Sequence, residues 1–182
     1  KTAKILAILR QIESRSGMSL PAVTHATGIG PLPALLEARA GRKALFSVFS
    51  DVGLPLALID NQTELVPMPQ LARLYQRAAH RVGDPVFGLA IGSAMAPGAY
   101  GTWVRYAMQA RTLGEGIRRG IRTLHLHQSG AAMGISARSD SLVAWEYWHQ
   151  DIADPMFRQH SDRLIPVMMR FIRGFLGPDW TP

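Results

Sequence analysis

The stretch GDPVFGLAIG at residues 83–92 places three glycines within ten residues, which is compatible with either a phosphate-binding loop or a packed helix. A dinucleotide-binding loop has the spacing G-x-G-x-x-G and follows a strand. Here the preceding residues have helical periodicity and the glycine spacing differs. On a helix, Gly88 and Gly92 lie on one face and permit close approach of another backbone. We therefore predict a packed helix that begins near Asp84 and Pro85.

Helical periodicity also extends over most of the flanking sequence. Pro69 opens a segment with apolar residues at helical spacing, which predicts a long amphipathic helix. Thr112 and Glu115 have the spacing of a capping box at a helix start. A last long helix is expected from about residue 155 to Gly177. The chain is therefore expected to consist mainly of helices.

Two segments near the C-terminal end have a different pattern. In AAMGISAR, residues 131–138, apolar side chains alternate, and LVAWEYWH, residues 142–149, is rich in aromatic and β-branched residues. The SDS between them is typical of a turn, so the pair predicts an antiparallel hairpin. We expect an α+β fold, mostly helical, in which helices pack on a small antiparallel sheet.

Composition narrows the functional classes. Of the 182 residues, 47% are hydrophobic, which is enough for a core, and there is no cysteine. Disulfides and thiolate metal sites are therefore excluded. No apolar run approaches the roughly 18 residues of a membrane span, so we expect no membrane contact and a cytoplasmic location. The net charge of +7 hints at an acidic partner, but the basic residues are spread evenly along the chain.

A DNA-binding module in residues 2–27 is one alternative function. Residues 2–15 have helical apolar spacing, and Ser19 favours a second short helix that ends at Gly28. Two helices joined by a turn resemble a helix-turn-helix. The second of them, SLPAVTHATG, carries no arginine or lysine, and this argues against DNA recognition by it.

A small metal-assisted hydrolase is the other alternative. On a strand, His125 and His127 would face the same side and could share a metal ion, with a third ligand from His149 or His160. The other interpretation is two ordinary polar histidines at a helix-to-strand boundary. No G-x-S-x-G motif and no paired carboxylates stand out. We therefore expect no catalytic residue, no metal and no cofactor.

The densest aromatic cluster lies in the second predicted strand. Alternation places Trp145, Tyr147 and His149 on one face and Trp148 on the other. Aromatic rings with polar tips suit a small-molecule pocket. They suit a sheet packed on helices equally well.

The segment from LPLALIDNQ to TLGEGIRR, residues 54–119, together with LGPDW at residues 176–180, resembles the N-terminal sensing domain of AraC/XylS-type bacterial transcription regulators. The resemblance covers roughly residues 28–182 and rests on the order and spacing of short pieces. These pieces are Gly53-Leu54-Pro55, Val66-Pro67, Gly83-Asp84-Pro85, Gly88-Leu89, Pro97-Gly98, Gly101, Tyr106-Ala107, Thr112-Leu113, Leu176 to Trp180, and Pro182.

The resemblance implies an effector-sensing and dimerisation domain at residues 28–182, preceded by a helical extension at 1–27. It implies a homodimer, and DNA binding only through a separate C-terminal helix-turn-helix domain that is absent from this chain. The aromatic, methionine-rich composition favours an apolar or aromatic small-molecule effector over a sugar. The residues predicted to bind the effector are Trp103, Tyr106, His125, Trp145, Tyr147 and His149.

Overall fold

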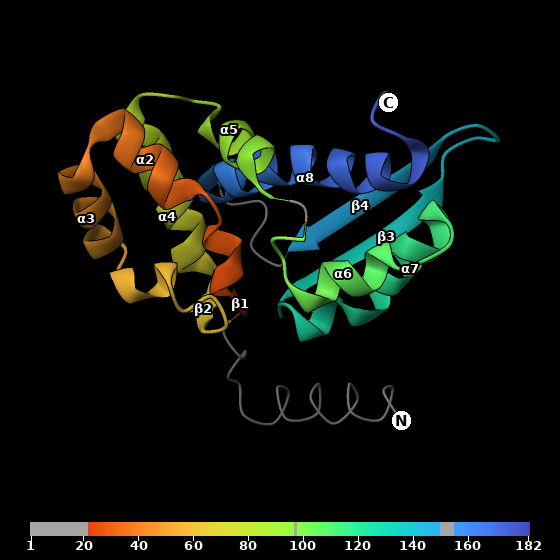
Figure 1. Ribbon diagram of the computed structural model, residues 1–182, viewed down its shortest axis with the longest axis horizontal. Coiled ribbons are helices and arrows are strands. Elements are labelled where there is room, and N and C mark those ends of the chain that lie inside the picture. Colours follow the sequence, from red (N-terminus) through yellow and green to blue (C-terminus); the bar gives the residue numbers. More distant parts are fainter. Residues whose placement is uncertain (1–21, 97, 150–154) are drawn as a thin grey trace.

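The computed structural model describes residues 22–96, 98–149 and 155–182, and it confirms an α+β, mostly helical fold (Figure 1). Its elements, in chain order, are β1 (Val23–His25), η1 (Ala26–Ile29), α2 (Leu32–Ala40), α3 (Arg42–Asp51), η2 (Leu56–Ile59), β2 (Leu65–Pro67), α4 (Met68–Val82), α5 (Phe87–Ala94), α6 (Thr102–Met108), α7 (Leu113–Thr123), η3 (Leu124–Leu126), β3 (Ala131–Ala137), β4 (Val143–His149), η4 (Pro155–Phe157) and α8 (Arg158–Leu176).

The larger hydrophobic core lies among α2, α3, α4 and α5. Helix α4 is central to it because Leu71, Leu74, Tyr75 and Ala78 follow helical spacing and are almost fully buried. The helix ends where Gly83 adopts a left-handed conformation, with φ of 68°, and its N–H returns to the last turn. This core forms one half of the molecule (Figure 1).

Helices α5 and α8 pack with their backbones in close contact. A Cβ atom at Gly88 would overlap the carbonyl oxygen of Gln159, and one at Gly92 would overlap that of Arg163. The side chain of Gln159 also accepts a hydrogen bond from the Gly88 N–H, at 2.7 Å. The predicted glycine-packed helix is therefore confirmed, although it begins at Phe87, after Asp84 has accepted a hydrogen bond from the Val86 N–H.

The second half of the molecule contains the predicted hairpin. Strands β3 and β4 pair antiparallel, with Ala131 opposite His149 and Ile135 opposite Trp145. A smaller hydrophobic cluster forms between this hairpin, α6, α7 and the C-terminal part of α8. Helix α8 runs from the α2–α5 core to the hairpin and so connects the two halves (Figure 1).

The second short helix predicted between Ser19 and Gly28 is wrong at residues 23–25, and only the short 3₁₀ helix η1 follows at residues 26–29. Residues 23–25 form β1, which pairs antiparallel with β2, and Thr24 also bridges to Gln128. Valine and threonine have modest helix propensity, and strand pairing supplies backbone partners instead. Residues 1–21 lie outside the described residues, so the helix at 2–15 and the domain boundary after residue 27 stay predictions.

None of the helices in the described part of the chain combines the length and the apolar character required to cross a bilayer.

Candidate functional site

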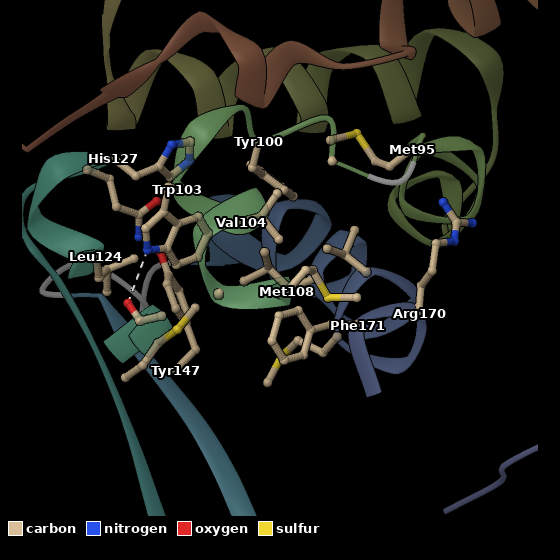
Figure 2. Close-up of a pocket in the computed structure, with 18 of the residues that line it drawn as sticks. Met95, Tyr100, Trp103, Val104, Met108, Leu124, His127, Tyr147, Arg170 and Phe171 are labelled. Atoms are coloured by element: carbon tan, nitrogen blue, oxygen red, sulfur yellow. Dashed lines mark hydrogen bonds between the residues drawn. The ribbon is translucent and has the colours of Figure 1, made fainter. Parts of the chain in front are cut away.

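A cavity of about 130 Å³ lies between the α2–α5 core and the hairpin half (Figure 2). We call it the central cavity. The lining side chains come from β1, from Met95, Ala96 and Tyr100, and from α6, α7, η3, both hairpin strands and α8. Its large apolar lining residues are Met95, Trp103, Val104, Met108, Ile117, Leu124, Met133, Trp145, Leu164, Val167, Met168 and Phe171.

One wall of the central cavity follows from the sequence of α8. Leu164, Val167, Met168 and Phe171 are spaced three and four apart, so they share one face of the helix. This face of the helix lines the central cavity. Phe171 also packs on Trp145 of β4, with ring centroids 5.4 Å apart.

The opposite wall depends on glycines in α7. A Cβ atom at Gly116 would lie 3.1 Å from the carbonyl oxygen of Ala107, so its absence lets α6 approach α7 closely. The indole N–H of Trp103 donates to the carbonyl oxygen of Gly120, at 3.0 Å. These contacts fix the α6 residues Trp103 and Val104 where they line the cavity (Figure 2).

One side of the cavity lining carries polar groups. The His127 ring stacks on Trp103, with centroids 5.0 Å apart, and meets the edge of Tyr100 at 5.3 Å. Burial, together with nearby His25 and Arg163, lowers the pKa of His127 to about 4, so this ring is neutral near pH 7. The Gln128 amide donates to the Tyr147 hydroxyl at 3.0 Å, and burial raises the pKa of Tyr147 to about 12.

Arg163 is the buried charged group of this polar side, at 2% exposure. Its guanidinium lies over the rings of Tyr75 and Tyr100, at 4.9 and 5.6 Å from their centroids. It donates to the Tyr100 hydroxyl, and one of its nitrogens lies 3.3 Å from Nδ1 of His160. Burial acts to lower the pKa of Arg163, but the neighbouring tyrosines outweigh burial and raise it, so the guanidinium stays charged.

Three of the six predicted effector-binding residues line the central cavity. They are Trp103, Trp145 and Tyr147, which the fold brings together from α6 and β4. The other three lie elsewhere. Tyr106 is 42% exposed and lines a more open groove on the outer side of α6, His125 is exposed on η3, and His149 is buried against the ring of Phe157.

The extended backbone that would let His125 and His127 share a metal ion is not formed. His125 lies within the 3₁₀ helix η3 and is exposed, whereas His127 follows it and is buried. The helical turn separates the two side chains because 3₁₀ geometry does not place residues i and i+2 on one face. Across the described ranges 22–96, 98–149 and 155–182, no group of three or more His, Asp or Glu side chains could hold a metal.

The sequence prediction missed Tyr100, His127 as a cavity residue, and Arg163. One signal was available for Arg163, because it lies four residues before Val167 and eight before Phe171, on the apolar stripe of its helix. A charge in such a stripe is unusual unless it has a buried role. Tyr100 had no comparable signal, because the turn that precedes α6 has no periodicity.

The comparisons with known proteins give one family. Residues 45–182, about three quarters of the chain, match the family model described as the N-terminal arabinose-binding domain of the AraC transcription regulator. No curated protein matches the chain. The matched range contains all the helices from α4 to α8 and both strands of the hairpin.

Proposed function

We propose that this chain, which belongs to the family of N-terminal arabinose-binding domains of AraC transcription regulators, binds a small apolar or aromatic effector in the central cavity. Members of this family are ligand-sensing regulatory domains. In the proposal, effector binding controls transcription through a separate DNA-binding domain, and the sensing domain acts as a homodimer.

The observation that carries the proposal is the apolar lining of the central cavity. Val104, Met108, Phe171 and their neighbours supply hydrocarbon and thioether surface. A pentose such as arabinose carries hydroxyl groups on most of its carbons, and each of them loses free energy if it is buried without a partner. A dry apolar cavity of roughly 150 Å³ binds benzene, so a cavity of this size suits one aromatic ring or a short aliphatic chain.

The position of the cavity suggests how binding is coupled to regulation. Its walls come from both halves of the molecule, from β1, Met95 and Tyr100 on one side and from α6, α7 and the hairpin on the other. A ligand that contacts both halves favours the arrangement in which both contacts form. Such a shift in population provides the coupling free energy that an allosteric regulator needs.

Isothermal titration calorimetry of the 182-residue chain tests the proposal. The probes are indole, phenylacetate, phenylacetamide and L-arabinose. We expect at least one aromatic probe to bind the wild-type chain. Val104→Phe should abolish that binding, because the added ring occupies the cavity.

The matched control is Val143→Phe, which adds the same ring at a position that is 63% exposed and does not line the cavity. This variant should bind like the wild type. Micromolar binding of arabinose without binding of the aromatic probes would contradict the proposal, and so would aromatic binding that Val104→Phe leaves unchanged. Sedimentation velocity of the same samples tests the homodimer.

A further inference from the structure

The charge of Arg163 is not matched by any acidic side chain among the described residues. Its neighbours are the rings of Tyr75 and Tyr100, the Tyr100 hydroxyl and the His160 imidazole, all of which are neutral acceptors or aromatic faces. Its Nε is buried and has no hydrogen-bond partner in the described part of the chain. Buried arginines usually pair with carboxylates, because an uncompensated charge in the interior is costly.

The groups that surround Arg163 add no second charge. Burial, followed by the effects of Arg163 and His149, lowers the pKa of His160 well below its usual value. His127 and Tyr147 are likewise neutral near pH 7 because their pKa values lie at about 4 and about 12. The polar side of the cavity therefore presents the positive charge of Arg163, with hydroxyl groups of Tyr100 and Tyr147 beside it. The other arginine of the lining, Arg170, donates to the carbonyl oxygen of Ser93 and lies on the side away from His127 and Tyr147 (Figure 2).

Beyond Arg163, the residues of α8 that line this cavity are apolar, apart from Arg170, which donates to the carbonyl oxygen of Ser93. Phe171 lies eight residues beyond Arg163 along this helix, which is about 12 Å at 1.5 Å per residue. From this polarity we infer that the effector is an amphipathic monocarboxylate, with its carboxylate on Arg163 and its apolar body along Val167 and Phe171. This inference deepens the proposed function and rests on it.

A carboxylate fits this arrangement better than a phosphate group. One guanidinium balances one negative charge, whereas a phosphate monoester carries between one and two at neutral pH and would bring an uncompensated charge into the interior. A guanidinium also binds the planar carboxylate with favourable hydrogen-bond geometry. Aromatic acids and short fatty acids share this chemistry, and the probes below distinguish them.

Calorimetry with matched acid and amide pairs tests the inference. The pairs are phenylacetate with phenylacetamide and octanoate with octanamide, titrated into the 182-residue chain at pH 7.5, where both acids are ionised. Members of a pair have nearly the same shape and differ in charge. We expect the acid of at least one pair to bind at least tenfold more tightly than its amide. The pair that shows this preference identifies the apolar part of the effector as aromatic or aliphatic.

Arg163→Gln should remove this preference, because it should lower the affinity for the acid and leave the affinity for the amide unchanged. The matched control is Arg158→Gln, because Arg158 lies on the same helix with a 64% exposed side chain and does not line the cavity. This control removes one positive charge from α8 and should retain the preference for the acid. If Arg163→Gln does not fold, the acid and amide comparison in the wild-type chain decides alone.

Equal binding of acid and amide, or tighter binding of the amide, would overturn the carboxylate assignment and leave the proposed function standing. A preference for the acid that persists in a folded Arg163→Gln would also overturn it. Absence of binding by every acid, amide and indole probe would overturn the proposed function together with this inference.

Discussion

Gly92 of α5 lies directly against the main chain of Arg163 in α8, so closely that a Cβ atom at position 92 would overlap the Arg163 carbonyl oxygen. Gly88 has the same relationship to Gln159, one turn earlier in both helices. The glycines therefore fix the depth at which α8 packs on the α2–α5 core. Because Arg163 lines the central cavity, the same contact also fixes the position of its guanidinium.

Gly92→Ala should destabilise the fold because the added methyl group meets backbone, which cannot move aside as a side chain does. We expect a loss of about 2 kcal/mol or more in the free energy of unfolding. Urea denaturation followed by circular dichroism measures it. In Gly114→Ala, the Cβ atom would meet only the guanidinium of Arg118, at 3.5 Å, so this control should be neutral or stabilised by up to about 1 kcal/mol. Equal stability of the two variants would contradict the packing account.

The stability of the fold should decrease as the pH falls from about 6.5 to about 4. The pKa of His127 is lowered to about 4 by burial, so below pH 6.5 the unfolded chain binds a proton that the folded chain does not. The contribution of His127 to the free energy of unfolding is therefore fully present above the pKa that this histidine has in the unfolded chain. It is lost as the pH falls towards the pKa of His127 in the folded chain. His127 alone accounts for on the order of 2–3 kcal/mol across this window.

His127→Phe isolates this contribution because phenylalanine keeps a ring against Trp103 and removes the titrating group. The loss of unfolding free energy between pH 6.5 and pH 4 should be smaller in this variant than in the wild type. His125→Gln, at an exposed position, should retain the full loss. Parallel stability curves for His127→Phe and the wild type would show that His127 is protonated equally in both states.

Tryptophan fluorescence should report occupation of the central cavity through Trp103 and Trp145, which line it. Titration with phenylacetate is expected to change the emission of the wild-type chain. The change should be reduced in Trp103→Phe, but not abolished, because Trp145 still contributes. Trp148, 46% exposed, does not line the cavity, so Trp148→Phe should keep the full change. A change in emission that Trp148→Phe reduces and Trp103→Phe leaves intact would place the ligand outside the central cavity.

The sequence was sufficient for elements whose signals are local. Thr112 accepts the N–H of Glu115 at 3.2 Å, as the capping-box spacing predicted, and the alternation of residues 131–138 predicted β3. Strand β1 could not be predicted because its pairing with β2 joins Thr24 to Val66, about forty residues away. Short strands of this kind are determined by tertiary contacts more than by propensity.

The candidate site was predictable only in part for the same reason. Trp103, Trp145 and Tyr147 were recognisable as aromatic residues on predicted elements, and they line the cavity. Whether His125 or His127 points inward depends on the 3₁₀ turn between α7 and β3, which has no periodic signal. The role of Arg163 depends on which residues face its side of α8, and the packing of α5 on α8 determines that.

Methionine methyl NMR tests the central claim, that a small molecule binds in the central cavity, most directly. Met95, Met108, Met133 and Met168 line the cavity, whereas Met68 is buried in the α2–α5 core and does not. In a chain labelled at the methionine methyl carbons and titrated with phenylacetate or octanoate, the account predicts shifts for the four cavity methionines and an unchanged Met68 signal. Saturable binding that leaves these four signals in place would contradict it.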